Sequence, residues 1–370
     1  RVAIHESRAQ QSYHRDFEIL TYNCGKIRIG EFVDSLFRKY SDYSVKFDDC
    51  EVLEILPEVI IYTINNESLK TDMCIPVRVS RHKAPDKFIK ITYSNGREII
   101  VTPEHPVYVW RDGGIVTIRA DEVKIGEFVP AIKFLPNNSS PITLKTEILP
   151  SEKEKQIKLP HTLSATLARL LGYLTSEGYF YSGRTYEVRF SNKDEMLIKD
   201  VQHICRELFG LNPTFTVSKY GVKTLRYLSK KLYDFIKHNF PELARKFSER
   251  RIPKQILSGS ADIAREFLKG LFLSDGSIDS YSITFKTSSK GLAEDYQDLL
   301  LKIGVSSSII RDKKGYYRVR ILSDSLERFT KNIIPKNSRL YPKALKLVRR
   351  SLNALESHDV FPPDVGENLI

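Results

Sequence analysis

The nine residues LLGYLTSEG at positions 170–178 recur in related form as LKGLFLSDG at positions 268–276. Each stretch is an apolar helical pattern in which a glycine is followed, four residues later, by a serine. Residues four apart share one helix face, so each helix has a face of small side chains. Such faces let two helix backbones approach closely. We therefore expect Gly172 and Gly270 to lie where two helices meet on a pseudo-twofold axis.

The repeat extends well beyond these two helices, over roughly residues 163–254 and 262–336. Its matched pieces occur in the same order in both copies, and each copy closes with a Pro-Lys pair. Each copy also reads helix, strands, helix, strands, helix, which predicts an α+β domain of two similar halves. We place these halves at residues 163–258 and 259–345. The matched positions include Phe190 with Phe285, Asp200 with Asp295 and Gln202 with Gln297.

An acid follows each small-residue face, Glu177 in the first copy and Asp275 in the second. An acid at a helix C-terminus faces the negative end of the helix dipole, and two such acids brought together repel each other. A divalent cation that prefers oxygen ligands, Mg²⁺ with Mn²⁺ as a substitute, relieves both problems. The pair predicts a metal site, flanked by Gly178 and Gly276 in the left-handed conformation that ends helices. The alternative is two ordinary surface acids before capping glycines.

The basic residues concentrate in the same segment. The chain of 370 residues has a net charge of +12, but residues 163–345 hold 32 Lys and Arg against 19 Asp and Glu, and the rest is nearly balanced. Because no apolar run is long enough to span a bilayer, this excess favours nucleic acid over a membrane. The alternative is a lysine-rich solvated surface. Candidate DNA contacts are Arg184, Arg189, Lys193, Lys219, Lys223, Arg226, Lys286, Lys290, Arg311, Lys313, Lys314, Arg318 and Arg320.

The two nonapeptides resemble the paired LAGLIDADG motifs of single-chain homing endonucleases. In that family the eighth position is the metal-binding acid, so the resemblance implies that Glu177 and Asp275 are catalytic, although Glu177 replaces the aspartate of the motif. The family also places a lysine near the metal in each half, which Lys254 and Lys336 match. The alternative is that each Pro-Lys pair marks a turn before a helix. The resemblance implies a monomer that cuts both strands of a long asymmetric DNA site, the host gene without its insertion.

Residues 12–145 are expected to form an all-β domain, followed by a linker at 146–162. A seven-residue repeat, IRIGEFV at 27–33 and VKIGEFV at 123–129, suggests two related halves. Alternating apolar residues on either side of Asn95-Gly96 predict a hairpin with a type I′ turn.

This first segment resembles the N-terminal part of inteins, the Hint fold, through DFEILT at 16–21 and TPEH at 102–105. The resemblance implies that the Ser12 hydroxyl attacks the preceding carbonyl to give an ester. Thr102 and His105 polarise that peptide bond, and His105 protonates the departing amine. Most inteins have Cys at this position, so Ser12 is either natural or a substitution that stalls splicing. The alternative for His105 is a structural histidine.

The two ends carry further expectations. Residues 1–11 resemble part of archaeal minichromosome maintenance helicases and are expected to be host flank. Residues 346–370 are expected to be a helical tail, so the C-terminal splicing segment lies elsewhere, for instance on another chain. The four cysteines show neither zinc nor disulfide spacing, which favours a cytoplasmic protein that associates with the nucleoid when it acts on DNA.

The sequence thus predicts a multidomain protein, an all-β Hint-like splicing domain and an α+β pseudo-twofold LAGLIDADG endonuclease. Two alternatives stay open. One is a LAGLIDADG-like module that binds DNA or RNA without cutting it. The other is a self-processing protein whose inserted domain is inert.

Overall fold

The structure, a computed structural model, describes residues 11–47, 49–55, 57–65, 68–147 and 157–353. These residues divide into two compact units, one that runs to Ile132 and one that begins at Lys133. A multidomain fold is therefore confirmed. Over the described ranges, no helix has both the length and the apolar character that a membrane crossing requires. Apart from Gln11, the expected host flank lies outside the described residues, as does most of the expected tail.

The first unit is built mainly from short antiparallel strands. They form hairpins β1-β2, β5-β6, β8-β9 and β10-β11 and a three-stranded sheet β3-β4-β7. The strands are β1 (Glu18–Leu20), β2 (Lys26–Arg28), β3 (Ser44–Lys46), β4 (Cys50–Leu53), β5 (Ile61–Asn65), β6 (Lys70–Cys74), β7 (Val79–His82), β8 (Ile89–Thr92), β9 (Glu98–Val101), β10 (Pro106–Arg111) and β11 (Gly114–Arg119). Helix α1 (Ile29–Lys39) and the short 3-10 turns η1 (Ser41–Tyr43) and η2 (Ala120–Glu122) complete it.

The seven-residue repeat does not produce a repeated structure. Its first copy ends β2 and starts α1, whose Val33, Leu36 and Phe37 are spaced as on one helix face and are buried with Leu53. Its second copy is a turn in which Gly126 has a φ of 92°. The two copies therefore differ in local structure, because the neighbours of each copy decide its conformation.

The predicted hairpin exists, but its turn type is wrong. Strands β8 and β9 pair from Ile89 with Val101 to Thr92 with Glu98. Five residues connect them, and only Gly96 has a positive φ, 81°. A type I′ turn needs positive φ at both central residues of a two-residue loop. Because the connection is longer than two residues, Asn95 does not need a positive φ.

The second unit contains two copies of one α+β arrangement, as the sequence predicts. The first copy has α2 (Ala165–Glu177), β12 (Gly178–Ser182), β13 (Tyr186–Asn192), α3 (Glu195–Phe209), β14 (Thr214–Val217), β15 (Lys223–Leu228), α4 (Lys230–Asn239), η3 (Pro241–Ala244), η4 (Phe247–Glu249) and α5 (Lys254–Ser258). The second has α6 (Ala261–Asp275), β16 (Gly276–Ile278), β17 (Ile283–Thr287), α7 (Lys290–Leu301), β18 (Ser307–Arg311), β19 (Tyr317–Ile321), η5 (Ser323–Ser325), α8 (Leu326–Ile333) and α9 (Tyr341–Asn353).

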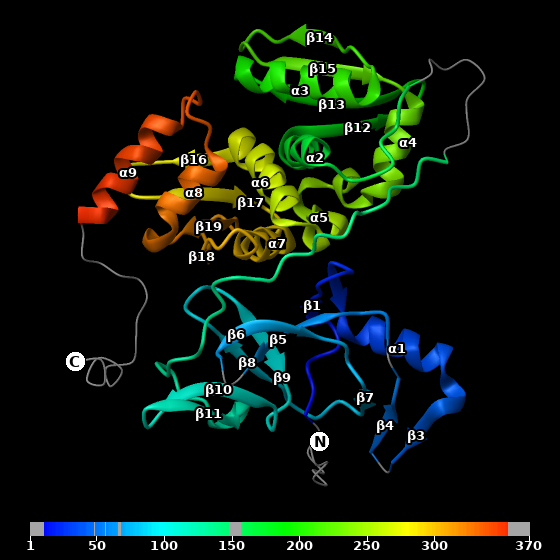
Figure 1. Cartoon of the computed structure of the whole chain (residues 1–370), viewed down its shortest axis with the longest axis vertical. Helices are drawn as coiled ribbons and strands as arrows, with labels where there is room; N and C mark the ends of the chain where they lie inside the picture. The colour runs from blue at the N-terminus through cyan, green and yellow to red at the C-terminus, as the bar shows by residue number, and fades with distance from the viewer. Residues whose placement is uncertain (1–10, 48, 56, 66–67, 148–156, 354–370) are drawn as a thin grey trace. The chain divides into compact units, whose positions relative to one another are not determined.

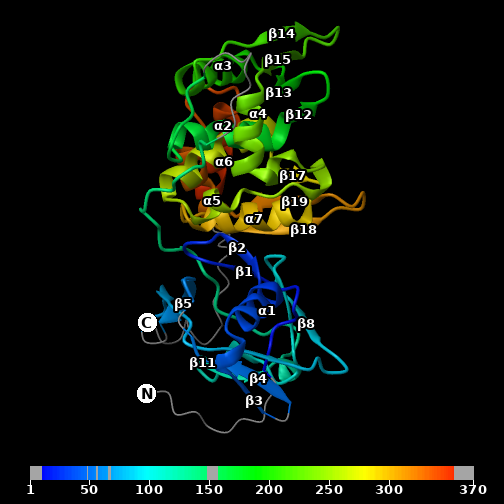
Figure 2. The same ribbon diagram turned by 90° about the vertical axis from the view of Figure 1, so that its right-hand side faces the viewer.

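The sheets of the two copies have the same topology. Their strand orders are β12-β13-β15-β14 and β16-β17-β19-β18, all antiparallel. Figures 1 and 2 show α2 and α6 between these two sheets. Phe190 and Phe285, matched in the repeat, are both buried on the helix side of their sheets. The pseudo-twofold α+β domain is therefore confirmed.

The boundary between the units differs from the expected one. Residues 133–145, expected in the β domain, belong to the second unit. Leu135 and Leu144 are buried there, and the Leu135 amide donates to the Leu301 carbonyl oxygen at 3.2 Å. Thr143 also bridges to Thr162 across the expected linker. No sequence pattern indicated this boundary, because residues 133–145 have little regular secondary structure.

Candidate functional site

Helices α2 and α6 touch through their backbones. A Cβ atom built on Gly172 would lie 2.2 Å from the Phe267 carbonyl oxygen, and one built on Gly270 would lie 2.2 Å from the Arg169 carbonyl oxygen. No side chain fits in that space, so both glycines are needed for the close approach. The sequence-based expectation for this helix pair is met.

The helix contact fixes where the two acids emerge. Glu177 and Asp275 are the last residues of α2 and α6, each five positions after the glycine at the contact. Equal offsets from one crossing point carry the two carboxylates to the same end of the helix pair. They are close enough that the charge of Asp275 raises the pKa of Glu177. The two predicted acids therefore form one site.

The surroundings of the two carboxyls oppose their ionisation. Burial is the main cause that raises the pKa of Glu177, followed by the charge of Asp275, while Arg250 acts in the opposite direction. Asp275 is reached by solvent, yet enough protein surrounds its carboxyl for burial to raise its pKa to about 6. A cation between the carboxylates would stabilise their ionised forms.

The glycines after the acids do not adopt the expected left-handed conformation. Gly178 has φ −76° and Gly276 also has φ −76°, both extended, because each begins a strand. Glycine is required for space instead. A Cβ at Gly178 would lie 2.3 Å from the Leu174 carbonyl oxygen, and one at Gly276 would lie 2.3 Å from the Phe272 ring.

A buried arginine that the sequence did not point to lies behind Glu177. Arg250 is 3% exposed, and its guanidinium donates to the carbonyl oxygens of Thr175 at 2.7 Å and Gly178 at 2.5 Å. The Thr175 carbonyl lies in the last turn of α2, where no helical amide can reach it, and Gly178 follows the helix directly. Burial lowers the pKa of Arg250 to about 10, and the charge of Glu177 raises it.

The arrangement around Arg250 is not repeated in the second half. Counting back from the repeated Pro-Lys pairs, the position of Arg250 corresponds to Asn332, whose side chain accepts from Arg265 at 3.2 Å. The two acids therefore have different electrostatic surroundings. Since the carbonyl oxygen of Gly178 accepts from this arginine, that oxygen is less available as a metal ligand than that of Gly276.

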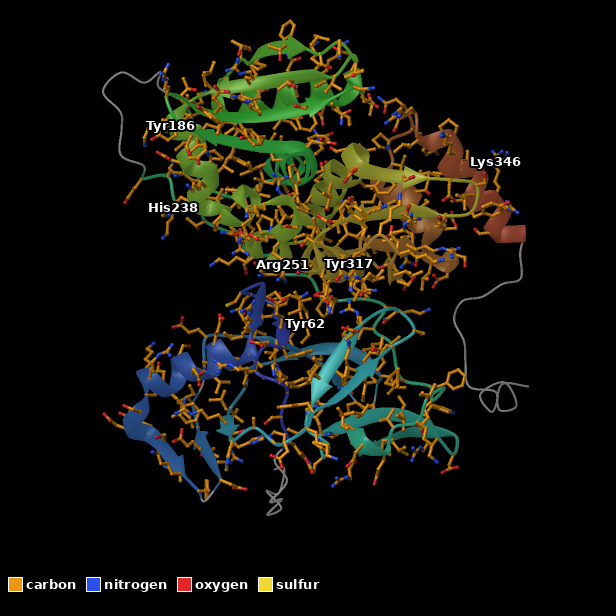
Figure 3. All side chains as sticks on the ribbon, turned by 180° about the vertical axis from the view of Figure 1, so that it is seen from behind. Tyr62, Tyr186, His238, Arg251, Tyr317 and Lys346 are labelled. Atoms are coloured by element: carbon orange, nitrogen blue, oxygen red, sulfur yellow. The ribbon has the colours of Figure 1, made fainter. Side chains whose placement is uncertain are left out.

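The catalytic role of the two predicted lysines stays a prediction. Lys254 starts α5, and its backbone amide bonds to the Glu242 carboxyl rather than to either site acid. Lys254 and Lys336 are both exposed. The neighbouring Arg251, which Figure 3 labels, forms a two-pronged ion pair with the buried Asp295 at 2.7 and 2.8 Å.

The residues present fit a metal ion with few protein ligands. Over the described part of the chain, no cluster of three or more His, Cys, Asp and Glu side chains could hold an ion. Two carboxylates alone suit Mg²⁺, which keeps most of its ligand positions for water and phosphate oxygens. Glu177 and Asp275 would hold such an ion, and its charge would offset the burial that raises the pKa of both carboxyls.

Each sheet of the second unit has one face covered by helices and one open face. On the first sheet Val188 and Leu225 point to the helices, so the alternating Arg189 and Arg226 lie on the open face. On the second sheet Val319 points to the helices. The open face there carries Lys286, Arg318 and Arg320.

A buried acid organises the basic residues on the first open face. Glu187 is 1% exposed and accepts from Arg189 at 2.7 Å and from Arg226 at 2.8 Å. The Arg226 guanidinium, followed by Arg189, lowers the pKa of Glu187 to about 2, so this acid stays ionised at neutral pH. On the second face, Asp312 binds Lys286 at 3.1 Å and Arg318 at 3.4 Å.

The remaining basic candidates divide into three groups. Arg184, Lys219, Lys313 and Lys314 are exposed in the turns between paired strands. Lys223 and Arg311 lie on the helix side of their sheets, opposite Val217 and Tyr317 in the strand register. Lys193 precedes α3, and Lys290 pairs with Glu294 along α7 at 3.5 Å. The open faces therefore do not include Lys223, Arg311, Lys193 or Lys290.

In the first unit, the three predicted splicing residues come together. The Ser12 amide donates to Thr102 Oγ1 at 3.1 Å, and the Thr102 amide donates back to the Ser12 carbonyl oxygen at 2.9 Å. The His105 amide donates to the Thr102 carbonyl oxygen at 3.0 Å, and its ring meets that of Tyr13 edge-on at 4.5 Å.

His105 is held in an unusual environment. Its Nδ1 atom is buried without a hydrogen-bond partner among the described residues, and burial lowers its pKa. The neutral ring is therefore favoured, and the unpaired nitrogen remains open to a further group. A second histidine, His82, lies 2.5 Å from Ser12 Oγ through its Nε2 atom, and no sequence motif indicated it.

Comparison with known proteins matches the second unit to one family. The family model described as LAGLIDADG-like domain matches residues 164–238 and 262–334, the two copies of the α+β arrangement. These residues form a LAGLIDADG-like domain. The two matched segments correspond to the two copies of the internal repeat. Glu177 lies in the first segment and Asp275 in the second.

Two curated relatives of the LAGLIDADG-containing chain are archaeal. One belongs to the A-type ATP synthase of Pyrococcus abyssi and is 29% identical over 64% of this chain and 24% of the relative. The other, Rpo1C of the DNA-directed RNA polymerase of Methanocaldococcus jannaschii, is 24% identical over 78% of this chain and 35% of the relative. The chain thus spans about a third or less of the length of these relatives.

Two solved structures also resemble parts of the chain. The homing endonuclease I-DmoI in complex with DNA and Mn is 22% identical, with a TM-score of 0.37 over 47% of this chain and 98% of that one. The PabCDC21-1 intein is 22% identical, with a TM-score of 0.31 over 32% of this chain and 71% of that one.

Proposed function

We propose that the second unit is a metal-dependent endonuclease that cuts both strands of a DNA duplex, and that the first unit is the N-terminal part of an intein. The observation that carries the nuclease proposal is the pair Glu177 and Asp275, brought together at the ends of two packed helices. A divalent cation between these two carboxyls would stabilise their ionised forms.

The residues around the proposed metal have separate tasks. Glu177 and Asp275 hold the cation, and Arg250 fixes the end of α2 so that Glu177 stays in place. A bound Mg²⁺ would supply charge stabilisation at the phosphate and acidify a water molecule. Because Arg250 has no counterpart in the second half, we propose that the two strands of the duplex are cut at unequal rates.

The open faces of the two sheets support DNA as the substrate. Their basic side chains suit phosphate groups and the guanine edges of the major groove. Glu187 and Asp312 restrain four of these side chains in fixed positions, which reduces the entropy lost on binding. The two faces carry different residues, so we propose a long target without twofold symmetry.

The relatives support an insertion into a host protein. The same segment is matched within a protein of an ATP synthase and within a protein of an RNA polymerase, two enzymes of unrelated function. A mobile element that removes itself by splicing accounts for a shared segment in unrelated hosts. The clustering of Ser12, Thr102 and His105 in the first unit supports the same proposal.

The nuclease proposal is tested with the full chain, Mg²⁺ and a duplex that joins the two coding sequences flanking the insertion. We expect one double-strand break near the junction, with Mn²⁺ as an effective substitute and EDTA abolishing the reaction. A duplex that still contains the insertion is the matched control and should stay intact. Tight binding to the junction without any cleavage would contradict the proposal and favour a binding module.

The splicing proposal is tested by trapping the ester at Ser12. Hydroxylamine attacks esters far faster than amides, so it should release the peptide that precedes Ser12 from the parent chain but not from Ser12→Ala. Mass spectrometry identifies the released peptide. Equal release from both proteins would contradict ester chemistry at this residue.

A further inference from the structure

His82 is the side chain that contacts the Ser12 hydroxyl. It is the last residue of β7, paired across the sheet with Cys50, and lies 70 positions from Ser12 in the chain. Its Nε2 atom is 2.5 Å from Ser12 Oγ, and its Nδ1 atom is 2.8 Å from the Lys83 carbonyl oxygen.

The second contact fixes which ring nitrogen carries the proton when His82 is neutral. A carbonyl oxygen can only accept a hydrogen bond, so Nδ1 of His82 carries a proton and donates to Lys83. In the neutral ring, Nε2 then has a lone pair and no hydrogen. The Ser12 hydroxyl is consequently the donor in the bond to His82, which leaves its oxygen activated for attack.

We propose that His82 is the general base that removes the hydroxyl proton of Ser12 in the first step of splicing. This inference rests on the proposed splicing function of the first unit. The arrangement is that of a nucleophile, its base and a third group that orients the base, here the Lys83 carbonyl.

The proposed step conserves atoms and electrons. The Ser12 hydroxyl proton moves to His82 Nε2 as the oxygen bonds to the carbonyl carbon of Gln11. The bond between that carbon and the Ser12 nitrogen then breaks, and the nitrogen takes a proton from protonated His105. Because burial lowers the pKa of His105, this protonated form is the minor one and also the stronger acid. Solvent removes the proton from His82 and returns one to His105, so an amide becomes an ester with no net change in protons.

The two histidines are suited to different parts of this step. His105 is buried, and its ring contacts Tyr13 rather than the Ser12 hydroxyl. His82 is in direct contact with the attacking oxygen. A hydroxyl ionises far less readily than a thiol, so a serine nucleophile depends on such a base more than a cysteine does.

The test measures hydroxylamine-induced release of the peptide before Ser12 in the full chain. His82→Ala should lower the rate about 100-fold. Added imidazole should restore part of it, because a small base can occupy the space left by the ring. In a Ser12→Cys background, His82→Ala should have a much smaller effect, because the thiol supplies its own thiolate. A merely structural role would give neither result.

His14→Ala is the matched control, since this histidine lies two residues from Ser12 but binds Asp16 and packs on Phe88. It should retain close to the parent rate. If His82→Ala releases the peptide as fast as the parent, the proposed role of His82 is wrong, while the splicing proposal stands. An absence of release from the parent would overturn the splicing function and this inference together. An equal loss in the serine and cysteine backgrounds, without rescue by imidazole, would also overturn the inference.

Discussion

Replacing Glu177 by Gln, or Asp275 by Asn, is expected to lower the rate of double-strand cleavage at least about 1000-fold, or about 4 kcal/mol of transition-state stabilisation. Each amide keeps the shape of the side chain but removes a charge that the metal requires. The open faces of the sheets are untouched, and one negative charge is lost, so DNA affinity should be unchanged or higher. Single-turnover cleavage and fluorescence anisotropy measure the two quantities separately.

The control for these two substitutions is Asp262→Asn. Asp262 lies in the first turn of α6, at the opposite end from Asp275, and pairs with Arg265 at 2.6 Å. It should cut DNA at close to the parent rate. Full cleavage by both Glu177→Gln and Asp275→Asn would show that the metal site lies elsewhere in the chain.

Gly172→Ala is expected to destabilise the LAGLIDADG-like domain by about 3 kcal/mol or more. The new methyl group would sit 2.2 Å from the Phe267 carbonyl oxygen, and backbone atoms cannot turn aside as a flexible side chain can. The two helices must move apart and lose packing along their contact. For a domain of this size the loss corresponds to a melting temperature about 10 °C lower.

Calorimetry on the full chain can follow this domain, with Gly114→Ala as the control. Gly114 lies in β11 of the first unit, and a Cβ there meets no heavy atom within 4 Å. That variant should melt as the parent does. An unchanged transition for Gly172→Ala would mean that α2 and α6 do not touch through their backbones.

The internal repeat explains why so much of the second unit could be predicted. Gly172 and Gly270 each give a weak signal, but their recurrence in matched helices indicates a contact and the place of the two acids. The extended backbone at Gly178 and Gly276 shows the limit of predicting a helix end from its capping residues. Both glycines are needed for space against the preceding turn, which a capping pattern does not reveal.

The basic side chains were only partly predictable. Lys223 and Arg226 are three positions apart in one strand, so they must point to opposite faces, and the buried Leu225 identifies the face of Lys223. Alternation could have excluded Lys223 from the open face. No pattern in the sequence could have shown that Glu187 would restrain Arg226, because that depends on the register between two strands.

Arg250 and His82 lay beyond sequence reasoning for a similar reason. Arg250 reaches the end of α2 from more than 70 positions away, and His82 reaches Ser12 from the end of β7. Arg250 has no matching arginine in the second copy of the repeat, and His82 belongs to no motif. Each becomes visible only when the fold brings its partner within hydrogen-bond distance.

The claim on which the nuclease account depends is that Glu177 and Asp275 hold a divalent cation together. Anomalous diffraction from crystals of the DNA complex grown with Mn²⁺ tests it most directly. We expect a manganese peak within ligand distance of one carboxylate oxygen of Glu177 and one of Asp275. A peak bound by neither carboxylate, in a complex that cuts its DNA, would contradict it.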